Sequence, residues 1–209
     1  LDTYGSGALE KHLADMDWVG RIALAHEEVV EAFARRAGAT VIPMKLFTMF
    51  SSRERALADL AGRRREIDAV VRRIAGAEEW GVRVMRGGPV AAAPAPAPRA
   101  RSGSAFLAAK KQARDAAREA SLAAAEAADA AYRRLSKLSR AARRRELEPA
   151  AGTRPPLLDA AFLVAAAKRA SFTRAARREA AACADAGATM TLSGPWPAYN
   201  FVQPEEAAG

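Results

Sequence analysis

Apolar positions near the start of the chain follow the period of an α-helix. Trp18, Ile22, Val29 and Phe33 recur at helical spacings, and His26 falls on the same predicted face. A glycine follows this pattern, and glycine commonly ends helices because it adopts the left-handed conformation of a C-cap without strain. The pattern therefore predicts an amphipathic helix that ends just before that glycine.

Two apolar segments farther along predict strands. Residues 40–50 are rich in apolar and β-branched side chains, which is typical of a buried strand, and residues 79–85 alternate as in a half-buried strand. Between them, a pair of serines offers an N-cap for a helix over residues 53–61. We expect a further helix through the apolar positions of residues 67–74.

Residues 103–147 are nearly all strong helix formers. At the rise of an α-helix, an unbroken helix of this length would reach roughly 65 Å. That length exceeds what a small domain can cover. Large apolar residues are few along it, so alanine lines most of the seam. We therefore expect close helix packing there, by self-association or with a partner.

Basic residues on this predicted helix form two ridges at a spacing of four. The first ridge consists of Lys110, Arg114 and Arg118. The second consists of Arg133, Lys137, Arg140 and Arg144. A solvated helix face is the more common origin of such ridges, and we give it the greater weight. The candidate partner-binding residues are Lys110, Arg114, Arg118, Leu135, Lys137, Leu138, Arg140 and Arg144. We expect glutamate at both leucines to abolish partner binding without unfolding the chain.

The last quarter of the sequence predicts a strand, a helix and a strand. The strands cover residues 157–166 and 188–192. Ser171 would cap the helix between them, which places Phe172 and Cys183 on one face, where Cys183 is expected to be a small core residue. With the strand and long helix that come before, the order is strand, helix, strand, helix, strand. This order is typical of an α+β layer of helices on a mainly antiparallel sheet.

Residues 87–102 run from Gly-Gly-Pro into alanine-proline repeats. Composition alone indicates an extended, semi-rigid linker between domains.

The chain is strongly basic, with a formal net charge of +9 and a pI near 10.4. Such a charge favours acidic partners, which leaves open nucleic acid, an anionic surface or an acidic protein. Basic residues are spread along the chain among 24 acidic ones, and no nucleic-acid recognition motif is present. Nucleic-acid or anionic-surface binding is therefore the alternative function, and nucleic acid is the less expected partner.

The sequence offers little for catalysis. It contains two histidines and one cysteine, no pair with metal-ligand spacing and no glycine-rich phosphate loop after a strand. We therefore expect neither an enzyme nor a bound cofactor, metal or small-molecule substrate. No signal-peptide pattern and no apolar run of membrane-spanning length is evident, so we expect a cytoplasmic protein without a membrane span.

Four segments, in order along the chain, resemble the signature segments of one known family. They are residues 41–50 (VIPMKLFTMF), 79–84 (EWGVRV), 102–107 (SGSAFL) and 194–202 (GPWPAYNFV). The family is the F/L family of gas vesicle accessory proteins, and the resemblance extends from about residue 15 to residue 203. Phe47 stands where the family commonly has a glycine, which tolerates positive φ far better than phenylalanine does.

The resemblance implies a helix-rich α+β protein of two small domains. Residues 1–76 would form a partial ferredoxin-like domain, shortened because family members usually begin with a further strand-helix-strand region, and would expose a strand edge at residues 40–50. Residues 77–209 would form a modified ferredoxin-like domain that includes residues 87–102 as a loop and residues 103–147 as the long helix.

For function, the resemblance implies a non-catalytic accessory protein in gas vesicle assembly. Its partners would be the small hydrophobic shell protein and other accessory proteins, met during nucleation or growth, and it would associate with gas vesicles in the cytoplasm. The family-signature residues are Pro43, Trp80, Gly81, Gly103, Phe106, Leu107, Gly194, Pro195, Trp196, Pro197, Tyr199 and Phe201. Trp196 is expected to be buried, and its loss to cost about 3–5 kcal/mol of stability.

Overall fold

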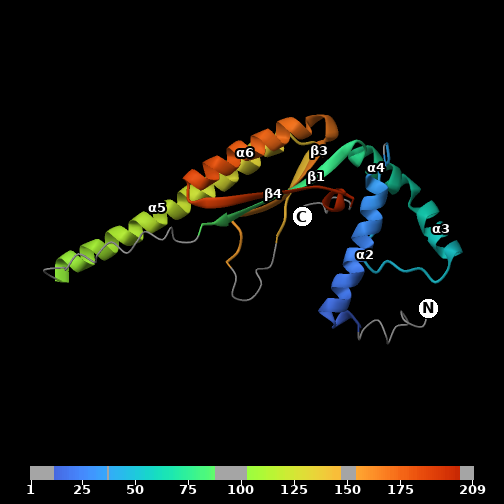
Figure 1. Cartoon of the computed structure of the whole chain (residues 1–209), viewed down its shortest axis with the longest axis horizontal. Coiled ribbons are helices and arrows are strands. Elements are labelled where there is room, and N and C mark those ends of the chain that lie inside the picture. Colours follow the sequence, from blue (N-terminus) through green and yellow to red (C-terminus); the bar gives the residue numbers. More distant parts are fainter. Residues whose placement is uncertain (1–11, 37, 88–102, 147–153, 203–209) are drawn as a thin grey trace. The chain divides into compact units, whose positions relative to one another are not determined.

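The computed structural model describes residues 12–36, 38–87, 103–146 and 154–202 (Figure 1). The chain folds as two units. One combines Leu1–Gly76 with Trp196–Gly209, and the other is Ala77–Pro195. Most of the proline-alanine tract predicted as a linker or loop, residues 88–102, lies outside the described residues.

The second unit is a four-stranded sheet with two long helices. Its elements, in chain order, are β1 Ala77–Arg86, α5 Gly103–Ser136, β2 Ala141–Arg144, β3 Leu158–Ala165, the 3-10 turn η2 Ala166–Lys168, α6 Arg169–Asp185 and β4 Ala188–Trp196. The strands are ordered β2-β3-β1-β4 across the sheet. Strand-helix-strand-strand-helix-strand is the ferredoxin-like arrangement. The expected α+β class is confirmed.

The pairing of β1 with β3 divides the side chains between the two faces of the sheet. The strands are antiparallel, and Trp80 lies opposite Phe162. Because side chains alternate along a strand, Trp80, Val82 and Val84 join the core on the helix side. Phe172 of α6 completes an aromatic cluster, with its ring 5.6 Å from Phe162 and 6.2 Å from Trp80.

Helices α5 and α6 supply the other wall of this core. Small residues of α5 are fully or almost fully buried, as are Ala176 and Cys183 of α6. Alanine on both helices allows their axes to come close together. The predicted common face of Phe172 and Cys183 on α6, with Cys183 in the core, is confirmed, and Phe172 is buried too. Ser171 does not cap this helix, because α6 begins at Arg169.

An ion triad lies on the other face of the sheet. Asp159 is 4% exposed and sits between two arginines. Arg83 donates from Nε to Oδ2 at 2.7 Å, and Arg145 donates from Nε to Oδ1 at 2.5 Å. Both carboxylate oxygens are therefore bonded, which offsets the cost of burying the charge.

The long helix is shorter than predicted. It ends at Ser136, and residues 141–144 form β2. Strand β2 is antiparallel to β3, and hydrogen bonds flank it, from Arg140 N to Leu163 O and from Arg145 N to Asp159 O. The local preference of these residues for helix is weak compared with the backbone hydrogen bonds offered by the edge of β3.

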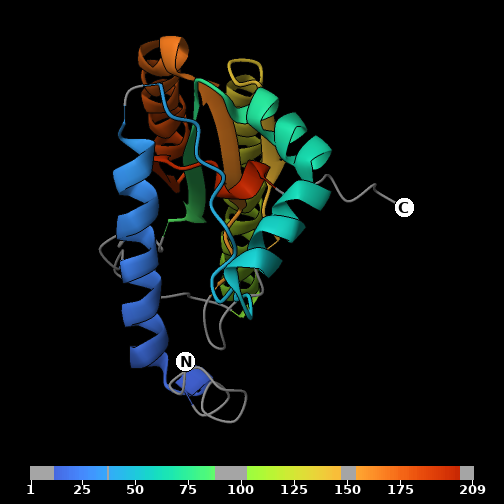
Figure 2. The same cartoon turned by 90° about the vertical axis from the view of Figure 1, so that its right-hand side faces the viewer.

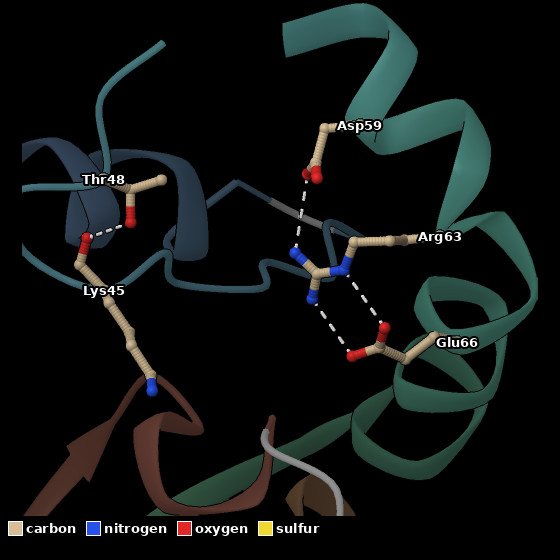
Figure 3. Close-up of polar contacts among 5 residues, drawn as sticks. All are labelled: Lys45, Thr48, Asp59, Arg63 and Glu66. Carbon is tan, nitrogen blue, oxygen red and sulfur yellow. Dashed lines mark hydrogen bonds and ion pairs between the residues drawn. The ribbon is translucent and has the colours of Figure 1, made fainter.

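The described residues of the first unit include helices α2 Met16–Ala34, α3 Arg53–Gly62 and α4 Arg64–Ile74, and a 3-10 turn, η3 Tyr199–Phe201. Asp15 caps α2 by accepting from two backbone N–H groups, and Ser52 caps α3 as predicted. Figure 2 shows α3 and α4 meeting at a bend. Arg63 lies at this bend, where it donates to Glu66 and pairs with Asp59 (Figure 3). Its hydrogen bonds lower the pKa of Glu66.

The strand predicted at residues 40–50 is wrong. None of residues 38–50 lies in a strand. Proline at position 43 lacks the N–H that a ladder needs, and the chain turns where the backbone N–H of Thr48 donates to Lys45 O at 3.1 Å. The Thr48 hydroxyl donates to the same oxygen (Figure 3).

Phe47 occupies the third position of this turn with a φ of 62°. Positive φ at that position is what a type II turn requires, and glycine usually supplies it. The backbone therefore keeps the conformation that the family's glycine favours, although the residue is phenylalanine. The ring is stacked on Trp18 at 5.8 Å, and Trp18 is stacked on His12 at 4.9 Å. Stacking helps to offset the backbone strain.

Within the described ranges, no helix combines the length and the apolarity that crossing a bilayer requires.

A close backbone approach next to the sheet gives a test of this fold. Gly87 N donates to Gly187 O at 2.9 Å, and a Cβ added at Gly87 would lie 2.6 Å from that oxygen. We expect Gly87→Ala to lower the free energy of unfolding by about 1–3 kcal/mol, because the backbones must move apart. Chemical denaturation of the full chain measures this change.

Gly103→Ala is the matched control, since nothing lies within 4 Å of its added Cβ. We expect a change within about 0.5 kcal/mol. Equal losses at the two glycines would contradict the close approach.

Candidate interaction site

The first half of α5 extends beyond the body of its unit. Every residue from 103 to 120 is exposed, whereas buried residues begin at Ala124. Figure 1 shows α6 lying along the other half of α5 and ending before the exposed half begins. We call residues 103–120 the stem. The 34 residues of α5 span about 50 Å, so the predicted overhang is present although the helix is shorter.

The junction between stem and body is marked by contacts at the ends of the strands. Arg86, the last residue of β1, donates from Nη1 to the Ser121 hydroxyl of α5. The next residue, Gly87, donates its backbone N–H to the carbonyl oxygen of Gly187, in the turn that follows α6. The sheet and α6 therefore both end next to Ser121, which leaves the stem without a neighbouring element from the described part of this unit.

One line of small and apolar residues runs along the whole of α5. In the body it consists of Ala124, Ala128, Ala131 and Leu135, all buried. In the stem the same spacing continues through Phe106, Ala109, Ala113, Ala117 and Ala120, all exposed. We call these five residues the stem stripe. Their spacing of three and four averages close to the helical period, so the line stays on one face of a straight helix.

A row of positive charge flanks the stem stripe on one side. It consists of Lys110, Arg114 and Arg118, which we call the basic ridge. Each of these residues directly follows an alanine of the stripe, and so lies about 100° farther around the helix. No carboxylate in the described residues forms an ion pair with them. The first predicted ridge is therefore present and accessible.

The second predicted ridge does not form. Lys137 and Arg140 follow the end of α5, and Arg144 lies in β2. There Arg144 bonds Asp129 at 2.7 Å, and its guanidinium lies 4.4 Å from the centre of the Tyr132 ring. The interruption of the helix at Ser136 is the reason, because the fixed helical spacing ends there.

Leu135 and Leu138 belong to the core of the unit or pack against it, rather than lying on its exposed surface. Leu135 is fully buried, and Leu138 is partly buried against the same core. A pair of glutamates at these positions would place charge in the core and unfold the unit. The expectation that this pair tests binding in a folded chain is therefore wrong.

The signature segments divide between core and surface. Pro43, Trp80, Gly81 and Phe201 are buried, whereas Phe106 and Leu107 are exposed in the stem. Gly81 faces Ser193, whose Oγ lies 2.7 Å from the position of an added Cβ, so glycine allows the close approach of these neighbouring strands.

Trp196 is less buried than expected. It ends β4 and is 40% exposed, so the predicted full burial is wrong. The segment before it contains Gly194, with a φ of 120° and a cis bond to Pro195. Tyr199 and Phe201 form the following turn η3, where Phe201 is 1% exposed. The anchor of this segment is therefore Phe201, rather than Trp196, whose burial the sequence analysis expected.

The described residues offer no group of histidine, cysteine, aspartate or glutamate that could hold a metal ion. Cys183 is buried in the core, and burial, with a smaller effect of the nearby Glu179 charge, raises the pKa of its thiol. A thiol of raised pKa is a poor nucleophile near neutral pH. The accessible chemistry of this unit is instead the apolar and basic surface of the stem.

Residues 1–203 match the profile of the family described as gas vesicle synthesis protein GvpL/GvpF. The chain belongs to this family. It is therefore a gas vesicle protein, and the resemblance found in its four sequence segments is confirmed. No curated protein matches the chain significantly.

Two crystal structures of GvpF proteins share the fold. The gas vesicle protein GvpF from Anabaena sp. PCC7120 is 14% identical with a TM-score of 0.64, and GvpF from Microcystis aeruginosa is 12% identical with a TM-score of 0.61. In both comparisons, the match covers 88% of this chain and 78% of the other. At this identity the likeness speaks for the fold alone.

The different burial of two signature tryptophans gives a second prediction. Trp80 is 7% exposed and contacts Phe172, whereas Trp196 is 40% exposed. We expect Trp80→Ala to lower the free energy of unfolding by about 3–5 kcal/mol. Trp196→Ala should cost about 1–2 kcal/mol, because less apolar surface is lost. Urea titrations of both variants measure these free energies of unfolding. A loss of stability in Trp196→Ala as large as that in Trp80→Ala would contradict the prediction.

Proposed function

We propose that this protein is a non-catalytic accessory protein in gas vesicle assembly. It binds the small hydrophobic shell protein, other accessory proteins, or both, during nucleation or growth of the vesicle. The family match over residues 1–203 is the observation that carries this proposal. We propose the cytoplasm, in association with gas vesicles, as its place of action.

The physical need for such a protein follows from the shell subunit. A small hydrophobic protein exposes apolar surface and unpaired strand edges until it is incorporated, and such surfaces aggregate. A partner that covers them transiently lowers that risk. The stem supports this role, because it presents exposed apolar residues, Phe106 and Leu107 among them, away from the folded body of its unit.

Binding of nucleic acid or of an anionic surface remains the alternative function. The basic ridge and the net charge of +9 favour it. Salt separates the two functions, because binding to phosphates weakens steeply with ionic strength, whereas apolar association persists. The partner can be sought by pull-down of each protein encoded with the vesicle genes, at low and at high salt.

The assembly role predicts a loss of vesicles. In a vesicle-forming host that lacks its own gene of this family, we expect few or no vesicles in electron micrographs, and restoration by the chain described here. Trp80→Ala should restore poorly, because the folded population falls with the stability of the sheet unit. Normal vesicles in the deletion host would contradict the proposal.

A further inference from the structure

We propose that the stem binds an acidic, alanine-rich amphipathic helix of a partner protein. The partner helix lies along the stem stripe and places its carboxylates beside the basic ridge. This inference deepens the proposed function by naming the kind of partner segment that the protein holds, and it is testable without vesicles.

In the body of α5, the line that continues the stem stripe is already covered by other elements of the unit. There, this line packs both with strands β1 and β3 and with α6, whose core residues include Ala175, Ala176 and Cys183. At the edge of this contact Arg134 of α5 bonds Glu179 of α6 at 2.8 Å. The protein therefore contains one example of an alanine-rich helix held beside this line with an arginine-carboxylate pair, on the flank opposite to that of the basic ridge.

The stem presents the same kind of surface, and no helix or strand among the described residues covers its stripe. Helix α6 ends at Asp185, and the stripe runs on past Ser121 through five more exposed positions. Alanine allows a second helix to approach closely, and Phe106, 59% exposed, provides one large apolar contact near the free end. Continuity with an existing helix-helix interface therefore favours a helix as the occupant.

The distribution of charge selects an acidic partner. Basic residues flank the stripe on one side only, while the residues that precede the stripe positions are Ala105, Ala108, Gln112, Ala116 and Glu119. In an antiparallel pair of two stems, like flanks meet, so the two basic ridges would repel. In a parallel pair, each basic ridge would meet the nearly neutral flank of the other. Neither self-pair supplies the carboxylates that a partner helix can.

The test uses the full chain and a synthetic peptide of about four heptads, long enough to be helical. Alanine and leucine form one face of the peptide, and glutamate lines one flank. We expect it to bind the wild-type chain, measured by fluorescence anisotropy. Reversal of the ridge, Lys110→Glu with Arg114→Glu and Arg118→Glu, should weaken binding about tenfold or more. A peptide with lysine in place of glutamate should bind the reversed-ridge variant more tightly than it binds the wild-type chain.

Two matched controls test whether binding depends on the stem itself. One excludes an effect of the net charge alone, and the other excludes an effect of exposed apolar surface alone. Arg174→Glu with Arg177→Glu and Arg178→Glu changes the net charge equally on the exposed side of α6, and should bind the acidic peptide as the wild type does. Phe106→Ser should weaken binding, whereas Leu122→Ser, which is 55% exposed on the opposite face of α5, should not. Circular dichroism confirms that each variant is folded.

Any one of the following results would overturn the inference. The first is equal binding by the wild type and the reversed ridge, or equal effects at Phe106 and Leu122. The second is a dimer in sedimentation equilibrium that Phe106→Ser abolishes, which would make a second copy the occupant. The third is displacement of the peptide by duplex DNA with a steep salt dependence, which would make nucleic acid the occupant. Loss of peptide binding with vesicle assembly intact would sink this inference and leave the proposed function standing.

Discussion

The antiparallel pairing of β1 with β3 is the constraint on which the sheet unit depends. It sets Trp80 opposite Phe162 and so directs the large apolar side chains of both strands to one face. Helices α5 and α6 must cover that face, because it would otherwise leave apolar surface in water. The same register directs Asp159 to the opposite face, where Arg83 and Arg145 bond both of its oxygens.

The free edge of β3 decides where the long helix ends. Its backbone groups bond Arg140 and Arg145 on either side of β2, and the residues between them leave the helical path. This shortens α5 at one end and places Leu135 and Tyr132 over the sheet. Among the described residues, nothing limits the other end of α5 in this way, since β1 and α6 both finish near Ser121. The stem is thus a consequence of a sheet shorter than the helix that covers it.

At Phe47 the fold imposes a backbone conformation that the residue type does not favour. The residue type disfavours a positive φ, yet the turn between Lys45 and Thr48 imposes it. The ring gains a stacked position on Trp18 that a glycine could not occupy. The stacking contact with Trp18, which is distant in sequence, therefore offsets the local cost of the positive φ at Phe47.

The sequence by itself determined the helices, the buried strands of the sheet unit, the overhang of a long alanine-rich helix and the family. Each of these depends on periodicity, on composition or on short segments that local residues specify, as with the spacing of Phe172 and Cys183 in α6. The sequence also located the first basic ridge, because a spacing of four needs only a continuous helix.

Tertiary structure alone decided the rest. Residues 140–145 favour helix locally, and only the unpaired edge of β3 makes them a strand. Leu135 belongs to the core and Phe106 to the surface, although both lie on one helical line, because the sheet ends between them. Trp196 and Phe201 share one short segment but differ in burial, since packing partners distant in sequence determine which ring is covered. Contacts between distant segments leave no local signal in a single sequence, and for this reason they could not be predicted from it.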